Sequence, residues 1–250
     1  MSGIWSACSG PDRIAPLEGS LLRLVESQAQ IATSHLGLSL EEQAELESLL
    51  ETSKPAMPDD ARGLHYLLAT PFRYPPLPHG SRFGRRFEPS LLYGSLHVGT
   101  VLAEAAYYRM VFWSGMERAP ERGIRTRHTL FSAEYACERG IRLQRAPFDA
   151  YRQGLTDRSD YRATQALGSA MREAGVQAFE FVSARDAEGG INVALFTPAA
   201  LFGTTPGLLQ DWSADTSASG VSYFCSRPST FVSFGVEQFL VDGMLPGPAV

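Results

Sequence analysis

The chain has 250 residues, of which 44% are hydrophobic and 20% charged, so it is long enough for one large domain or one domain with an appendage. Its formal net charge of −5 excludes a global attraction to nucleic acid, and no apolar stretch reaches the roughly 18 residues of a membrane span. Three scattered cysteines and five dispersed histidines predict neither a disulfide framework nor a metal site.

The N-terminal sixty residues are predicted to form a helical hairpin that packs against the rest of the chain or binds a partner. Leucine, valine, isoleucine and alanine recur at helical spacing over residues 18–36. A second helix is predicted to begin at Ser39, where Glu42 completes a capping box, and to end at Lys54-Pro55. The opening MSGIWSACSGPDR lacks the pattern of a secretory signal, which favours a cytoplasmic protein.

Residues 61–250 are predicted to form the main domain. In its first part, His65–Thr70 fits a short extended segment, and the proline-rich stretch Pro71–Pro89 fits a loop long enough to indicate a function. Leu91–Ser95 is predicted to be a short strand, and Val98–Trp113 a helix with one broad apolar face.

Strand patterns dominate the second part of the chain. Residues 128–136 alternate as a strand does, with Gly140–Leu143 as a candidate partner, and residues 146–160 read as a loop. A helix is predicted over Tyr161–Ala174, with Gly175 as its C-cap. After it come a hairpin and further strand-like pieces, at Val176–Val182, Ile191–Thr197 and 210–234. The fold class is therefore α+β, a mixed or antiparallel sheet with helices on it and a helical N-terminal piece.

Two residues of the first half have patterns that favour chemistry, although each also has a structural interpretation. Glu104 lies beside the apolar face of its helix, where a carboxylate needs partners, or it is a rim residue paired with an arginine. Arg82 lies in HGSRFG, whose glycines let a ligand approach, so it fits a pyrophosphate contact or a solvated basic loop. Arg73 is a second arginine candidate in the same basic stretch.

The other candidates are neutral side chains. Tyr93 fits either stacking on a flat heterocycle or packing in the core. Ser183 follows an apolar strand without a GxSxG elbow, and Asn192 begins the returning strand, so both also fit turn positions. Neither GxGxxG nor a P-loop occurs, so the sequence supports no Rossmann or P-loop nucleotide site.

Four of these segments resemble the RES domain family, and they occur in the family's order. They are GSRFG at 80–84, LLYGS at 91–95, the AE of VLAEAAYYR at 102–109, and FVSARDAEGGINVALF at 181–196. The resemblance covers roughly residues 62–235. The arginine, glutamate and serine that give the family its name correspond to Arg82, Glu104 and Ser183.

The resemblance implies a fold similar to ADP-ribosyltransferase toxins and an enzyme that consumes NAD as its substrate, without a recycled cofactor. Arg82, Tyr93 and Glu104 would line the NAD pocket, with Arg73, Ser183 and Asn192 as further binding candidates. The expected partner is a cognate Xre-type antitoxin protein rather than nucleic acid or a membrane. The acceptor stays open between phosphate, water and a protein side chain, as do homo-oligomerisation and a non-catalytic interaction role for the basic loop.

Overall fold

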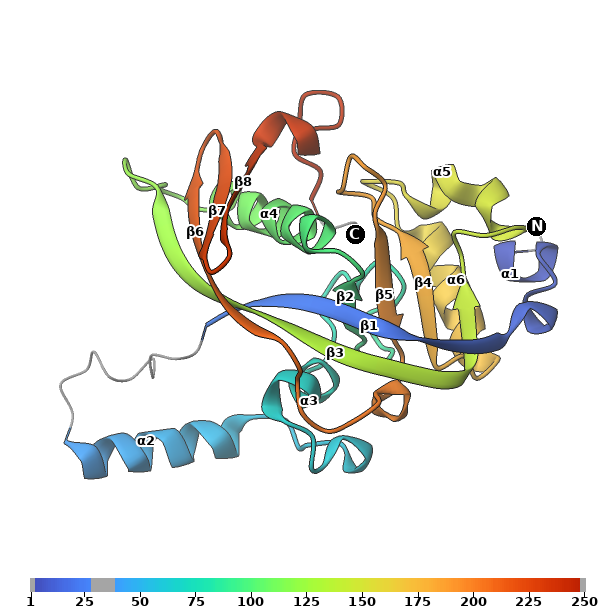
Figure 1. The fold of residues 1–250 in the computed structure, drawn as a ribbon, viewed down its shortest axis with the longest axis horizontal. Helices are drawn as coiled ribbons and strands as arrows, with labels where there is room; N and C mark the ends of the chain where they lie inside the picture. The colour runs from blue at the N-terminus through green and yellow to red at the C-terminus, as the bar shows by residue number, and fades with distance from the viewer. Residues whose placement is uncertain (1–2, 28–38, 248–250) are drawn as a thin grey trace.

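The computed structural model describes residues 3–27 and 39–247, and over these residues one mixed sheet carries the helices (Figure 1). The α+β class predicted from the sequence is confirmed. The strands are β1 (Ala15–Glu26), β2 (Leu92–Ser95), β3 (Ile124–Arg142), β4 (Ala178–Val182), β5 (Ile191–Leu195), β6 (Leu209–Ser217), β7 (Gly220–Ser226) and β8 (Ser229–Gly235). The helices are α1 (Ile4–Ala7), α2 (Leu40–Ser53), α3 (Tyr66–Arg73), α4 (Val98–Ser114), α5 (Arg152–Leu155) and α6 (Arg162–Glu173).

The strands follow the order β1-β2-β5-β4-β3-β6-β7-β8, and β1 pairs again with β3. Strand β3 makes this possible because it is long enough to have several neighbours. Along one edge it pairs antiparallel with β1, from Gly140↔Ala15 to His128↔Glu26. Its other edge pairs first with β6 and then, at Gly140, with Ala178 of β4 in parallel. Strands β1, β2, β5, β4 and β3 therefore close into a ring.

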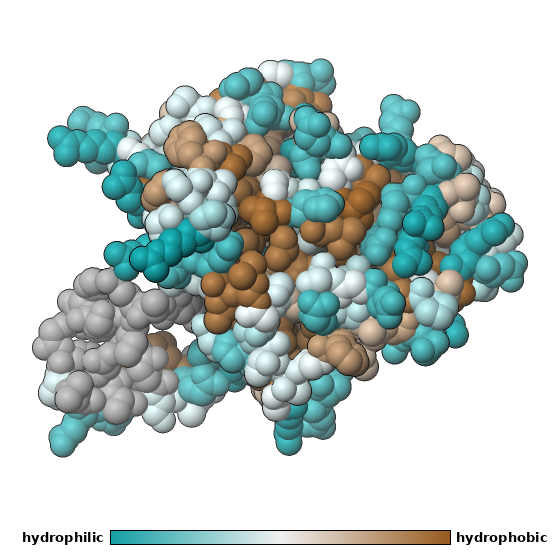
Figure 2. All heavy atoms as spheres, in the orientation of Figure 1, coloured by the Kyte–Doolittle hydropathy of each residue, from teal (hydrophilic) through white to brown (hydrophobic). Residues whose placement is uncertain are grey.

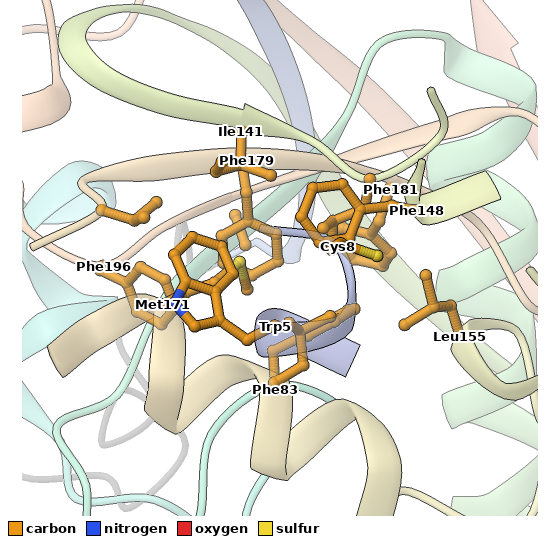
Figure 3. Close-up of a cluster of buried hydrophobic side chains, with 14 of the residues drawn as sticks. Trp5, Cys8, Phe83, Ile141, Phe148, Leu155, Met171, Phe179, Phe181 and Phe196 are labelled. Carbon is orange, nitrogen blue, oxygen red and sulfur yellow. The ribbon is translucent and has the colours of Figure 1, made fainter. Parts of the chain in front are cut away.

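An aromatic cluster fills the space between the β4–β5 part of the sheet and the helices α1 and α6 (Figure 3). The ring of Phe83 lies edge-on to Phe179 at 4.8 Å and to Phe181 at 4.7 Å between centroids. Such pairs contribute about 0.5–1.5 kcal/mol beyond the burial of their area. Because Phe83 is fully buried, this cluster anchors the loop that carries Arg82.

A second part of the core lies under α4. The buried face of this helix, which includes Leu102, Tyr107 and Met110, packs against Trp212 of β6 and Tyr223 of β7. The predicted helix over Val98–Trp113 is confirmed, but the apolar face expected from its spacing is only partly buried: Val101 and Leu102 are buried, whereas Tyr108 and Phe112 are exposed. Among the described residues, no helix combines the length and the apolar character needed to cross a membrane.

The first half of the predicted helical hairpin is wrong. Residues 15–26 form strand β1, and the remainder of the stretch beyond Ser27 lies outside the described residues. Leu17 and Leu21 are buried, a spacing that suits a helix and a strand equally. The alternation is hidden at Gly19, where a Cβ atom would lie 2.7 Å from the Tyr135 hydroxyl. Since β1 belongs to the sheet, the N-terminal segment is not a separate helical extension over these residues.

Two further assignments are wrong for related reasons. The extended segment predicted at His65–Thr70 is part of helix α3, whose first turn His65 caps by accepting a hydrogen bond from the backbone N–H of Leu67. The two strands predicted around Cys137 are one continuous strand, β3. Gly140 suggested a new beginning, but it is required inside the strand because a Cβ there would lie 2.1 Å from that of Leu17.

Several local predictions are confirmed by their hydrogen bonds. Ser39 and Glu42 form the capping box of α2, which ends at Ser53 before Lys54-Pro55. Gly175 follows α6 with a positive φ of 73°, as a C-cap glycine does. Strands β4 and β5 pair antiparallel across the predicted glycine turn. The segment 146–160, predicted as a loop, contains the short helix α5.

The buried His128 on β3 predicts a pH dependence of stability. Its Nε2 lies 3.2 Å from Nη1 of Arg109, and an arginine can only donate, so the imidazole is neutral and accepts. Burial and the Arg109 charge lower the pKa of His128 to about 4. The unfolded chain, with a pKa of roughly 6.5, takes up a proton first as the pH falls, so stability present above pH 6.5 is lost toward pH 4.

We expect the free energy of unfolding to fall by about 2 kcal/mol when the pH is lowered from 7.5 to 4.5, because His128 is protonated more readily in the unfolded chain. Urea unfolding of the wild type and of His128→Gln at both pH values measures the difference between the two proteins. An equal loss in both would contradict the assignment to His128.

Candidate active site

A cavity of about 330 Å³ opens where β1, β2, β4, β5, the 77–82 loop and one face of α4 meet. Pockets for small molecules have volumes from about 300 Å³ upward. Figure 2 shows one face of the protein, with apolar residues gathered in its middle and hydrophilic residues around them. Four sequence-predicted residues line the cavity: Arg82 of the loop, Tyr93 of β2, Glu104 of α4 and Asn192 of β5.

Glu104 is held in the cavity by hydrogen bonds to two of the other predicted residues. Its Oε1 accepts from the Ser183 hydroxyl at 2.6 Å and from the Asn192 side-chain amide at 2.7 Å. The Oδ1 of Asn192 in turn accepts from the hydroxyl of Ser95 at 2.6 Å. All three of these neutral partners are buried. The carboxylate is therefore positioned by donors at the end of β4 and the start of β5, the second of which is held by β2, and no arginine pairs with it among the described residues.

Ser183 has a second role at the end of β4. Its hydroxyl oxygen accepts from the backbone N–H groups of Arg185 and Asp186 at 3.1 and 3.0 Å. Asp186 accepts from the Thr100 hydroxyl in the first turn of α4 at 2.8 Å. The serine thus fixes the turn after β4 while it donates to Glu104. The Ser183 hydroxyl therefore donates its proton to the Glu104 carboxylate and accepts from the backbone of the turn.

Tyr93 turns its hydroxyl toward the arginine-bearing loop. This oxygen lies 2.9 Å from the Ser81 hydroxyl and accepts from the Phe83 backbone N–H at 3.2 Å. Burial raises the pKa of Tyr93 to about 12. The phenol therefore stays protonated at neutral pH, so it can bind and shape the cavity but cannot serve as a base.

Arg82 reaches across to the segment before α6. Its Nη1 donates to the Asp157 carbonyl at 2.7 Å, and its Cζ lies 4.4 Å from the centre of the Tyr161 ring. Neither contact supplies a negative charge, and no carboxylate lies within 4.0 Å of its guanidinium among the described residues. The cation is thus fixed in direction and keeps its charge for a ligand.

Arg73 is not brought to this cavity. It ends α3, donates to the Pro55 carbonyl at 2.6 Å and pairs with Glu51 of α2 at the same distance. The local arginine density of the sequence thus divides between a cavity residue and a tie between two helices. The spacing of the arginines in the sequence does not predict which of them reaches the cavity, because this depends on how the chain folds after Arg73.

Sequence reasoning missed several residues that line the cavity or support it. Arg23 of β1 lines it and donates to the Tyr93 carbonyl at 2.6 Å. Tyr161 and Arg185 line it as well, and Ser95 holds Asn192. Arg185 could have been identified from the sequence, because it lies within the FVSARDAEGG segment that resembles the family. Arg23 could not, because its stretch was predicted to be helical.

A mixed α+β domain whose cavity combines one positioned carboxylate with several arginines has the features of a pocket for an anionic small molecule. Residues 57–217 match the sequence profile of the RES domain, so the chain belongs to the RES domain family. None of the curated proteins matches it. Among solved structures, it is similar to the M. tuberculosis MbcT–MbcA toxin–antitoxin complex, with a TM-score of 0.49 and 12% identity over 87% of this chain and 94% of that chain.

The Glu104–Asn192 contact predicts a strong effect of an isosteric substitution. Asn192→Asp replaces the amide donor by a second carboxylate against Oε1, so two like charges meet in a partly buried site. We expect the free energy of unfolding to fall by about 1–3 kcal/mol at pH 8. The loss should shrink as the pH falls below about 5, where one proton shared by the pair restores a hydrogen bond.

Denaturant unfolding at pH 8 and pH 4.5 tests this, with Gln153→Glu as the control because it makes the same charge change at an exposed position of α5. Equal unfolding free energies for Asn192→Asp and the control at pH 8 would show that the contact does not position Glu104.

Proposed function

We propose that this protein is a RES-type toxin that degrades NAD by cleaving the bond between nicotinamide and ribose. The observation that carries the proposal is the Glu104 carboxylate, fixed through one oxygen by Ser183 and Asn192 in the same cavity as Arg82 and Tyr93. Its membership of the RES family supports the same reaction, because these are the positions that the family resemblance assigns to the NAD pocket.

The chemistry suits a fixed carboxylate. As the carbon–nitrogen bond breaks, its electron pair leaves with nicotinamide, which departs neutral and needs no acid. Positive charge develops on the ribose carbon, as in other glycosidic cleavages, and a preorganised negative charge stabilises it. Oε2 of Glu104 has no hydrogen-bond partner among the described residues, so it is free to face the ribose. An acceptor oxygen then bonds to the carbon and loses its proton to solvent.

The remaining residues bind rather than react. Arg82 carries the charge that a pyrophosphate requires, and its contacts to the Asp157 carbonyl and the Tyr161 ring orient it without neutralising it. Tyr93 offers an aromatic surface while its hydroxyl holds the loop at Ser81 and Phe83. Arg82 and Tyr93 can both bind the substrate at neutral pH, because binding by either residue requires no proton transfer.

The proposed setting is the cytoplasm, where such a reaction exhausts the NAD of the producing cell. An enzyme of this kind needs an inhibitor, and the family resemblance suggests a cognate antitoxin with an Xre-type region. The proposed acceptor is phosphate or water, which gives phosphorolysis or hydrolysis. Transfer to a protein side chain is the alternative outcome of the same cleavage.

Glu104→Gln provides the direct test. Glutamine retains an oxygen that accepts from Ser183 and Asn192, so the fold should persist while the negative charge is lost. We expect NAD cleavage to fall by about 100-fold or more, the loss seen when one stabilising group is removed from a reaction centre. Purified protein is incubated with NAD, with and without phosphate, and nicotinamide release is measured beside thermal unfolding.

Glu188→Gln is the matched control, since Glu188 is exposed and does not line the cavity. Incubation of the wild type with labelled NAD and cell extract detects transfer to protein. If wild-type protein leaves NAD intact under both phosphate conditions and labels no protein, the enzymatic proposal fails. If Glu104→Gln cleaves NAD as fast as the control, the glutamate is not the catalytic carboxylate.

A further inference from the structure

Arg185 stands out because it is a buried cation without a counter-charge in the part of the chain that the structure describes. The residue is 3% exposed and lines the same cavity as Glu104. Its Nη2 donates to the Arg158 carbonyl at 2.8 Å and to the Tyr161 hydroxyl at 3.1 Å. Its Nη1 is buried and has no hydrogen-bond partner among the described residues. No carboxylate pairs with this guanidinium over the same residues.

Such an arrangement is unfavourable on its own. Buried cations are ordinarily paired, and an unpaired one costs several kcal/mol. The Tyr107 ring, whose centre lies 3.5 Å from the Arg185 Cζ, offers a cation–π contact that recovers part of that cost. It does not supply a negative charge, because burial raises the pKa of Tyr107 to about 12 and its hydroxyl donates to the Pro246 carbonyl.

The neighbouring charges point the same way. Arg82 lies over the ring of Tyr161, and Arg185 is bonded to the hydroxyl of that tyrosine, so one side chain joins the two cations. Arg23 lines the cavity too, and its Nε is buried without a hydrogen-bond partner among the described residues. The carboxylate of Glu104 is committed to Ser183 and Asn192 and neutralises none of them.

Arg185 is also close to the reacting end of the cavity. The backbone N–H of Arg185 donates to Ser183, which donates to Glu104. Its guanidinium rests on Tyr107, which lies on α4 three residues beyond Glu104, about one helical turn away. An anion bound to Arg185 would therefore lie near the carboxylate and not at a remote surface.

We propose that Arg185 is a second anion-binding residue of the cavity and that it takes a phosphate group. Arginine matches phosphate through charge and through its planar set of donors. The proposal rests on the proposed function for the source of that group, which is either the pyrophosphate of the dinucleotide or a free phosphate that accepts the ribose. Arg185 thus binds substrate in addition to supporting the Arg158–Tyr161 segment.

Binding measurements test the proposal without requiring turnover. Isothermal titration is performed with inorganic phosphate and, separately, with NAD on Glu104→Gln protein, at constant ionic strength. Arg185→Gln and Arg185→Lys are each combined with Glu104→Gln and compared with it. Because Arg185→Gln removes charge-assisted hydrogen bonds to phosphate, we expect the dissociation constant to rise about 10-fold or more in this variant and less in Arg185→Lys.

Arg158→Gln is the control, because it removes an equal charge and does not line the cavity. Among the described residues, the Arg158 side chain donates to the Ala184 and Gln238 carbonyls, and the backbone carbonyl that accepts from Arg185 is retained in this variant. Its affinities should match those of the parent. Weaker phosphate binding alone assigns Arg185 to the free phosphate, and weaker NAD binding assigns it to the dinucleotide. Either result supports the proposal.

Unchanged affinity for both ligands in folded Arg185→Gln overturns the proposal and leaves Arg185 a structural residue. If that variant does not fold, Arg185→Lys decides, since lysine keeps the charge but cannot reproduce the arginine's donor geometry: unchanged affinities there overturn it. A parent protein that binds neither ligand also overturns it. Binding without NAD cleavage by wild-type protein, in contrast, would refute the proposed reaction and leave the anion site standing.

Discussion

The Glu104 carboxylate is the constraint around which the cavity is organised. A charge on the core-facing side of a helix must be hydrogen-bonded, and here its two donors come from the end of β4 and the start of β5. Ser95 of β2 donates to the Oδ1 of Asn192, an arrangement in which the amide nitrogen faces Glu104. The network therefore joins α4 to β2, β4 and β5. Any displacement of these strands relative to the helix would leave a buried polar group unpaired.

That network depends in turn on the ring of strands. Residue 192 faces residue 95 across the β2–β5 ladder, and β2 is joined to β1 at Leu22↔Ser95. Strand β1 lies against β3, which also pairs with β4. The hydrogen bonds that hold Glu104 thus depend on the ring of strands that β3 closes by pairing with both β1 and β4. The register of strands far apart in the sequence determines the position of one carboxylate.

The sequence predicted those parts of the protein whose signals are local. The capping box at Ser39, the helix around Glu104 and the glycine turn before Asn192 each depend on residues only a few positions apart. The β1 strand could not be predicted, because Gly19 hides its alternation and its stability comes from pairing with a segment over a hundred residues away. For the same reason Arg23 was not found, although its side chain lines the cavity.

The candidate site shows the same limit. Arg82, Tyr93 and Glu104 were identified by motif, and the structure brings them to one cavity. Arg73 looked equivalent to Arg82 in sequence, yet only the three-dimensional path shows that Glu51 pairs with Arg73 and that, within residues 3–27 and 39–247, no carboxylate reaches Arg82. Charge density along a sequence cannot distinguish a tie between helices from a ligand contact. The presence or absence of a paired carboxylate in the structure distinguishes these two roles.

This difference gives the cavity its electrostatic character. Its arginines are held by carbonyls, a tyrosine hydroxyl and aromatic rings, which orient a cation without cancelling it. Its one positioned carboxylate is likewise held by neutral donors. Among the described residues, opposite charges thus lie in one small cavity without forming an ion pair. Such a cavity suits an anionic ligand, and it fits the proposed dinucleotide substrate, which would carry negative charge at its phosphates and develop positive charge at its ribose during the proposed cleavage.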